Sequence, residues 1–343
     1  DSKRKRRKST PFRDRLVLML KHGSFCTGYG GLDMAVEHFY DAETVWHSEI
    51  DKHCSQLLKK HGYENNLGDL TEINWDDVEP VDIMSAGFPC QPFSHAGNRK
   101  GNNDERAIFQ WIADGISVLR PRVVVLENVA GILTLGGTSV IGALTEIGYD
   151  ARWGLVRASD VGTCHRRERW FCIAFDSTSD RRSLRQTGKI HKSKSRPVNG
   201  SNRVPVPNTV GAQSQRHGVS TIRSSQRNFK PTCDIANVTD PAGVGLQELR
   251  PERGLGETET ETRRLSSFGA YEPAVRRWEQ TLGRTAPVPV DERGINNSFV
   301  EWMMGLPENH VCNQGLSRTA ELKMLGNGVV PQQALQALAL LNE

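Results

Sequence analysis

Two kinds of apolar spacing alternate along the first half of the chain. Short apolar runs, which predict strands, lie at residues 16–20, 45–48, 81–85 and 123–126, with two later ones near 151–156 and 171–175. Apolar residues spaced three or four apart, which predict helices, lie at residues 32–40, 107–119 and 139–147. Strands that alternate with helices in this order predict an α/β fold built on a doubly wound, mostly parallel sheet.

The pattern changes after residue 175. Residues 177–265 are rich in Ser, Arg, Gly, Asn, Thr and Pro and hold few large apolar side chains, so we expect much of this segment to be loosely ordered. Helical spacing returns beyond Tyr271, and helices are predicted over residues 299–307 and 332–341. A chain of 343 residues interrupted in this way fits one large domain and a second, smaller one.

The charge of the chain is unevenly distributed. Residues 3–8 are six consecutive Lys or Arg residues, and residues 177–235 hold 12 Lys and Arg against 2 Asp and Glu. The net charge is only +4, so the rest of the chain is acidic. Two basic segments of this kind favour a polyanion such as nucleic acid as partner, although runs of charge are more often simply solvated.

Hydropathy and cysteine spacing exclude several classes of protein. The sequence contains no run of 18 apolar residues and no apolar stretch of signal-peptide type, so we expect neither a membrane span nor secretion. Its seven cysteines include no Cys-x-x-Cys pair, which argues against a zinc site and a disulfide framework. An odd number of scattered cysteines suits a reducing, cytoplasmic location.

A glycine-rich turn follows the first predicted strand, in the sequence Phe25-Cys26-Thr27-Gly28-Tyr29-Gly30-Gly31. Glycines let the backbone turn tightly and approach a ligand at a helix N-terminus. Glu49 and Asp69 end the next two predicted strands, where acidic groups contact ribose hydroxyls in nucleotide sites. Each feature alone is as well explained by a tight turn or a helix cap, but in this order they predict a purine-nucleoside cofactor.

The candidate catalytic groups also lie at strand ends. Cys90 follows the predicted strand at residues 81–85 in a loop stiffened by prolines, which favours a presented thiol over a buried one. Glu127 follows the most apolar strand, where burial raises a carboxyl pKa and lets it act as an acid. Arg167 and Arg169 precede the last strand, and their spacing predicts that both side chains point to the same face. A thiol with an acid can attack and protonate an electron-poor ring.

Together and in order, these residues resemble the motifs of the DNA (cytosine-5) methyltransferase family. The turn at residues 25–31 is similar to the family's cofactor motif Phe-x-Gly-x-Gly-Gly, and residues 87–94 resemble its nucleophile motif. Residues 127–129 look like the motif of the catalytic acid, Arg167 and Arg169 match its Arg-x-Arg, and residues 326–331 resemble the closing motif. The resemblance covers residues 16–175 and 299–341. His165, Gly328 and residues 299–307 depart from the usual family pattern.

This resemblance implies a Rossmann-like, S-adenosylmethionine-dependent methyltransferase with a smaller target-recognition domain. The implied parts are a basic tail over residues 1–14, a catalytic and cofactor-binding domain over 15–176, a target-recognition region over 177–298 and a C-terminal segment over 299–343 that returns to the catalytic domain. We therefore expect a monomeric enzyme of a bacterial or phage-type host cytoplasm, associated with the nucleoid through double-stranded DNA, without a metal and of the kind found in restriction-modification systems.

The resemblance also implies roles for individual residues. The target cytosine is flipped out of the duplex, Cys90 attacks C6, and Glu127 hydrogen-bonds or protonates N3. Arg169 holds the base oxygen and Arg167 supports the site. The implied cofactor-binding residues, which would hold S-adenosylmethionine, are Phe25, Gly28, Gly30, Gly31, Glu49, Ile50, Asp69, Pro89, Asn327 and Val329.

Three alternative functions stay open at the level of sequence. An RNA cytosine methyltransferase would use the same nucleophile, and a catalytically silent DNA-binding homologue would share the fold. A nicotinamide-dependent oxidoreductase is also doubly wound, but the spacing of Gly28, Gly30 and Gly31 differs from the dinucleotide-binding pattern.

Overall fold

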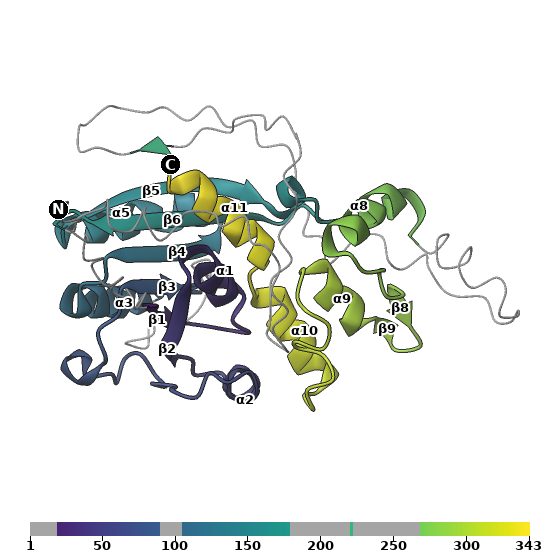
Figure 1. Ribbon diagram of the computed structural model, residues 1–343, viewed down its shortest axis with the longest axis horizontal. Helices are drawn as coiled ribbons and strands as arrows, with labels where there is room; N and C mark the ends of the chain where they lie inside the picture. The colour runs from purple at the N-terminus through teal and green to yellow at the C-terminus, as the bar shows by residue number, and fades with distance from the viewer. Residues whose placement is uncertain (1–18, 90–104, 179–219, 222–267) are drawn as a thin grey trace, which may run out of the picture.

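A seven-stranded sheet forms the centre of the protein in a computed structural model that describes residues 19–89, 105–178, 220–221 and 268–343 (Figure 1). The strand order is β2-β1-β3-β4-β6-β5-β7. In chain order the strands are β1 (Leu20–Phe25), β2 (Ala42–Ser48), β3 (Ile83–Ala86), β4 (Val123–Val129), β5 (Tyr149–Arg157), β6 (Glu168–Asp176) and the short β7 (Ser220–Thr221).

The sheet consists of a parallel half and an antiparallel half. Strands β2, β1, β3 and β4 pair in parallel, whereas β6 runs antiparallel to both β4 and β5. The parallel strands are connected through helices, as parallel pairing requires. The mostly parallel, doubly wound arrangement predicted from the sequence is confirmed, and the two late strands form an antiparallel pair at one side of it.

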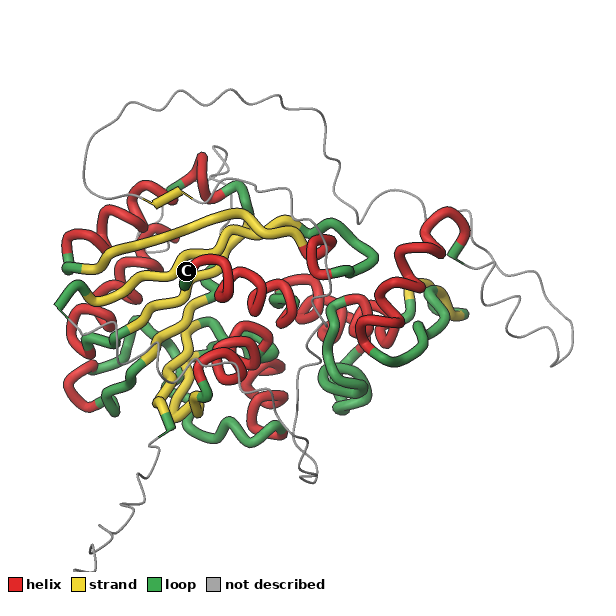
Figure 2. The backbone as a smooth tube through the Cα atoms, turned by 45° about the horizontal axis from the view of Figure 1, so that its top comes forward, coloured by secondary structure: helices red, strands yellow, loops and turns green. Residues whose placement is uncertain are grey.

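Helices cover both faces of this sheet (Figures 1 and 2). On one face, α1 (Gly31–Tyr40) and the last helix α11 (Pro331–Leu341) pack on Ile83, Val125 and Ile173. On the other face, α3 (Glu105–Leu119) and α5 (Gly137–Glu146) pack on the strand residues whose side chains point to that side of the sheet. Successive residues of β4 and β6 thus contribute to opposite cores, which explains why residues 123–126 are continuously apolar.

The C-terminal part of the chain adds a second group of elements beside the sheet (Figure 1). Helix α8 packs against α9 through a cluster that includes Trp278, Phe299 and Trp302. This cluster spans the predicted boundary at residue 298. The remaining helices and strands are α2 (Lys52–Lys60), α4 (Ile132–Leu135), α8 (Glu272–Leu282), β8 (Val290–Asp291), β9 (Gly294–Ile295), α9 (Asn297–Met303) and α10 (Arg318–Asn327), with short 3₁₀ turns at Trp75–Asp77, Ala158–Val161 and Gly269–Tyr271.

The first strand lies later in the chain than its apolar pattern predicts. A strand was expected at residues 16–20, but β1 begins at Leu20 and runs through polar residues to Phe25. Its buried His22 ring nitrogens lie 2.8 Å from Thr44 Oγ1 and 2.9 Å from Ser85 Oγ, so burial leaves neither unpaired. Gly23 leaves room for the Trp46 indole, since a Cβ there would overlap it. The hydrophobic pattern does not predict this strand, because its buried polar residues are satisfied by internal hydrogen bonds.

The predicted strand ending at Asp69 is wrong. The structure has only an isolated bridge between His47 and Asn66, after which the chain is irregular. Asp69 instead accepts hydrogen bonds from Thr71 N at 2.9 Å and Thr71 Oγ1 at 2.8 Å. Asp69 therefore caps a local turn with its side chain and does not mark the end of a strand.

No helix in the described ranges combines the length and the apolar character that a membrane crossing requires.

Candidate active site

A cavity of about 390 Å³ opens at the edge of the sheet where the parallel strands end. That volume is in the range of small-molecule sites, and the carboxyl edge of a doubly wound sheet is where ligands bind. The sequence-predicted residues that line it are Phe25, Gly28, Gly31, Glu49, Pro89, Glu127, Arg169, Asn327 and Val329. Four others do not line it, namely Gly30, Ile50, Asp69 and Arg167. Cys90 lies outside the described residues.

The glycine-rich turn between β1 and α1 forms one wall of this cavity. Gly28 and Gly30 have φ angles of 61° and 83°, which favour glycine over residues with a side chain. The Gly28 amide donates to Glu49 Oε2 at 2.8 Å, and Asp51 N donates to Glu49 Oε1 at 2.8 Å. Burial raises the pKa of Glu49, while these two hydrogen bonds oppose that shift. Turn and carboxylate therefore hold each other at the cavity wall.

Phe25 contributes less to the cavity than the motif comparison implies. It stands three residues before Gly28, whereas the Phe of Phe-x-Gly stands two before the glycine. Its ring packs edge-on against Trp46 and Trp75, with centroids 5.4 and 5.5 Å apart. Cys26, at φ 52°, takes the position that the motif gives to Phe. Its thiol has a pKa raised to about 12, chiefly by burial and also by Glu49.

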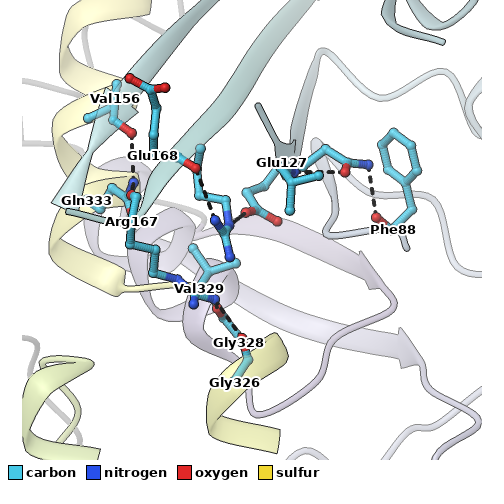
Figure 3. A network of polar contacts seen from close by, with 12 residues as sticks. Phe88, Glu127, Val156, Arg167, Glu168, Gly326, Gly328, Val329 and Gln333 are labelled. Carbon is cyan, nitrogen blue, oxygen red and sulfur yellow. Dashed lines mark hydrogen bonds and ion pairs between the residues drawn. The ribbon is translucent and has the colours of Figure 1, made fainter. Parts of the chain in front are cut away.

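Glu127 and Arg169 form a mostly buried ion pair across the parallel–antiparallel junction (Figure 3). Arg169 Nε lies 3.1 Å from Glu127 Oε1, and their side chains are 16% and 8% exposed. Burial raises the pKa of Glu127, and the guanidinium groups of Arg169 and then Arg167 oppose that shift. Its other carboxylate oxygen faces Gly87, where a Cβ would lie 3.6 Å from it. The acid therefore adjoins the chain that leads to Cys90.

Asn128 makes a buried contact that the sequence does not reveal. Its amide Nδ2 donates to the carbonyl of Phe88 at 3.0 Å, and both groups are buried (Figure 3). This hydrogen bond ties the end of β4 to the backbone two residues before Cys90. The only sequence signal for this contact is that Asn128 directly follows Glu127.

Arg167 contacts the closing segment rather than the cavity (Figure 3). It precedes β6, with φ 29°, so it does not continue the face of that strand as predicted. Its Nη2 donates to the carbonyl of Gly326 at 3.0 Å and also to that of Gly328. Gln333 Nε2 in turn donates to the Arg167 carbonyl at 2.8 Å. Arg167 thus fixes residues 326–328, all three of which line the cavity.

A buried carboxyl group lies beneath the turn. Asp33, in the first turn of α1, lines the cavity and is completely buried, and its Oδ1 accepts a hydrogen bond from Ser85 Oγ at 3.4 Å. Burial raises its pKa to about 7, although Ser24 and Ser85 oppose the shift. The nearby His22 has a pKa lowered to about 3 by burial, so it is neutral near pH 7. Asp33 therefore sits where a neutral carboxyl is favoured.

The opposite wall of the cavity comes from α10 and the segment that follows it. Lys323 Nζ forms an ion pair with Asp51 Oδ2 at 3.0 Å and so joins α10 to the start of α2. Asn327, one turn further along α10, also lines the cavity. Within the described ranges, no group of three or more His, Cys, Asp or Glu side chains could hold a metal ion.

Comparison with known proteins gives one family. The family model for C-5 cytosine-specific DNA methylase matches residues 20–339. The type II methyltransferase M.DsaV of Dactylococcopsis salina is 32% identical over 167 residues, which is 47% of each chain. M.HhaI of Haemophilus parahaemolyticus is 31% identical over 168 residues, covering 48% of this chain and 51% of that one. The chain thus aligns with about half the length of these curated relatives.

Solved structures share the fold across most of the chain. The Dnmt2 methyltransferase of S. pombe superposes with a TM-score of 0.55 at 15% identity and covers 94% of this chain and 98% of that one. A DNMT2 mutant of Spodoptera frugiperda gives a TM-score of 0.52 at 17% identity, over 94% and 100%. At such identities the likeness concerns the fold alone.

Proposed function

This chain belongs to the C-5 cytosine-specific DNA methylase family, and on that premise we propose that it transfers a methyl group from S-adenosylmethionine to C5 of cytosine in a specific double-stranded DNA sequence. The observation that carries the proposal is the pairing of Glu127 with Arg169 beside the backbone that leads to Cys90.

The cavity suits a cofactor with a ribose and an amino-acid end. Glu49 retains acceptor capacity beyond its hydrogen bonds to Gly28 and Asp51, since a carboxylate offers about four lone-pair sites. We assign the ribose hydroxyls to Glu49, and the methionine end to Asn327 on the opposite wall. Ile50, with 71% of its surface exposed, is available at the rim for the adenine ring. S-adenosylmethionine bound there supplies an electrophilic methyl group.

Glu127 acts on N3 of the flipped cytosine. A protonated carboxyl donates to N3 and draws electron density from the ring, which makes C6 open to a nucleophile. Burial favours this protonated form, and Arg169 keeps the carboxyl oriented. Arg169 Nη1 already donates to the Glu168 carbonyl at 3.0 Å, so we assign the O2 oxygen of the base to the remaining N–H groups of this guanidinium.

Cys90 is the proposed nucleophile. Its thiolate adds to C6, C5 becomes nucleophilic and takes the methyl group, and loss of the C5 proton expels the thiolate and restores the ring. Asn128 holds the Phe88 carbonyl and so anchors the start of the loop that carries the thiol.

Duplex DNA is the proposed partner, held through phosphates by the basic segments at residues 3–8 and 177–235, which lie almost wholly outside the described residues. Bases would be read by the target-recognition region, residues 177–298. Neutralising Lys and Arg of residues 181–196 should flatten the salt dependence of DNA binding, measured as log affinity against log salt. An unchanged slope would assign the phosphate contacts elsewhere.

Methyl transfer from tritiated S-adenosylmethionine to duplex DNA tests the proposal, with structured RNA as the parallel substrate. Cys90→Ala should abolish transfer to DNA and leave cofactor binding within about threefold of the wild type. Bisulfite sequencing of DNA from cells that express the protein would report the target sequence. Transfer to RNA alone, or turnover by Cys90→Ala, would overturn the proposal.

A further inference from the structure

The Tyr29 ring occupies the space between two glycines that are almost 300 residues apart. A Cβ on Gly328 would lie within 2.5 Å of three Tyr29 ring atoms, Cε1, Cζ and Cδ1. A Cβ on Gly31 would lie within 2.5 Å of Tyr29 Cε2 on the other edge of the ring. Tyr29 is 1% exposed, and no side chain could be added at Gly328 without displacing it.

Hydrogen bonds fix the ring in this place. The Tyr29 hydroxyl donates to the carbonyl of Val329 at 2.7 Å, and a ring nitrogen of His310 lies 2.8 Å from the Tyr29 carbonyl. Gly28 on one side of Tyr29 lines the cofactor cavity, as do Asn327 and Val329 on the other. The ring therefore sets the distance between the two walls of the cavity.

The two glycines are required for different reasons. Gly328 has φ −76° and ψ 177°, a conformation open to any residue, so only the Tyr29 ring excludes a side chain there. At Gly31 a Cβ would also lie within 2.5 Å of the Val329 carbonyl oxygen, which belongs to the backbone and cannot turn away. Gly328 thus depends on the residue at position 29, whereas Gly31 does not.

We propose that Tyr29 is a positioning residue for the cofactor site and that Tyr29 and Gly328 form a matched pair. The ring seats the closing segment at residues 326–329 on the glycine-rich turn and so sets Asn327 and Val329 against the cofactor. This inference rests on the proposed binding of S-adenosylmethionine. The consequence is that the two positions can change together but not separately.

Binding of S-adenosylmethionine to the full chain, measured by calorimetry, tests the pair in a double-mutant cycle. Gly328→Ala should weaken binding about tenfold or more in the wild type, because overpacking must shift the closing segment. In a Tyr29→Ala background, which lacks all the ring atoms that a Gly328 side chain would overlap, the same change should weaken binding by less than about threefold. An equal loss in both backgrounds would overturn the proposal.

Gly31→Ala is the matched control. It should weaken binding about tenfold or more in both backgrounds, because the Val329 carbonyl remains in its way. If Tyr29→Ala rescues Gly31→Ala as well as Gly328→Ala, the pairing is not specific and the inference fails. If Gly328→Ala does not fold, recovery of a cooperative thermal transition in the double variant supports the pair, and its absence overturns it.

Tyr29→Phe separates the hydrogen bond from the ring. It keeps the volume but leaves the Val329 carbonyl without its hydroxyl donor, so we expect S-adenosylmethionine binding about three- to tenfold weaker with a kcat near that of the wild type. A fall in kcat with unchanged binding would overturn the positioning role. A wild-type chain that binds no S-adenosylmethionine would instead refute the proposed function, and thermal unfolding of the same cycle would still test the pair.

Discussion

The two halves of the sheet supply the candidate site in opposite ways. In the parallel half, the turn after β1, Glu49 after β2, Gly87 after β3 and Glu127 in β4 reach the cavity from the carboxyl ends of their strands. In the antiparallel half, Arg169 reaches the same edge from the amino end of β6, where it pairs in register with Val129. Because β6 runs antiparallel to β4, the arginine motif at the start of β6 lies at the same sheet edge as the motifs that follow the parallel strands.

This comparison shows why the ion pair of Glu127 and Arg169 matters. The two residues lie on neighbouring strands that run in opposite directions, so a shift of register between β4 and β6 would separate them. The parallel half carries the acid and the glycine-rich turn, and the antiparallel half carries Arg169, which pairs with the acid. Substitutions in the two halves should therefore have different effects on activity and stability.

Glu127→Gln should give the largest effect, and it tests the parallel half. The amide keeps the size of the side chain but cannot release or take up a proton, so we expect kcat to fall about 10²- to 10⁴-fold. The pKa of Glu127 is raised, so its proton is lost as the pH rises through that value. The alkaline decline in kcat should therefore be present in the wild type and absent in the variant. A variant with wild-type kcat would remove Glu127 from the chemistry.

Arg169→Gln tests the antiparallel half through stability. It leaves the buried Glu127 carboxylate without its partner, which should cost about 3 kcal/mol of unfolding free energy. The loss should be larger at pH 8 than at pH 5, because a carboxyl with a raised pKa takes up a proton at low pH and no longer needs the partner. Urea denaturation at both pH values measures this. The double variant Arg169→Gln/Glu127→Gln should recover part of the stability, and equal losses at both pH values would contradict the account.

Asp33→Asn returns to the parallel half and should change stability in the opposite direction. The folded-state pKa of Asp33 is about 7, above its usual 3.8, so the wild type loses stability from this group as the pH rises between those values. The neutral variant should therefore gain about 3 kcal/mol relative to the wild type between pH 5 and pH 8. Urea denaturation of both proteins across that range measures the difference, and a constant difference would place the ionisation elsewhere.

Arg167→Met should give the smallest effect. It removes the donor to the Gly326 and Gly328 carbonyls, which we expect to cost about 1 kcal/mol and to weaken S-adenosylmethionine binding rather than kcat. Arg167→Lys, which retains a charged donor, is the control and should lose less. Equal losses of kcat in Arg167→Met and Glu127→Gln would erase the distinction between the two halves.

The sequence predicted most of the fold because its signals are local. The continuous apolar run at residues 123–126 could only be a buried strand, and residues 32–40 and 332–341 have clear helical spacing. Nine of the named site residues line one cavity, and all of them except Asn327 and Val329 lie at or beside the ends of predicted strands. Position at a strand end is visible in sequence, and a sheet gathers such positions at one edge.

The rest depends on contacts between distant segments, which no local pattern encodes. Strand β1 was missed because His22 is buried with hydrogen-bond partners on two neighbouring strands. The prediction that Arg167 shares a face with Arg169 is wrong because the alternation of strand β6 begins only at Glu168. The role of Tyr29 cannot be predicted from local sequence, because its ring packs against Gly328, which is 299 residues away in the chain.

The last helix has a consequence for how the protein is made. Helix α11 packs against α1 through residues such as Ala35, Ala337 and Leu338, and Asn342 donates to the Tyr40 hydroxyl at 2.8 Å. The end of α1 at Tyr40 and the start of α11 at Pro331 are 291 residues apart, so the apolar side of α1 stays uncovered while that intervening stretch is synthesised. A nascent chain, or one that terminates between these two helices, would expose that surface, which makes such a truncation a route to aggregation and a demand on chaperones.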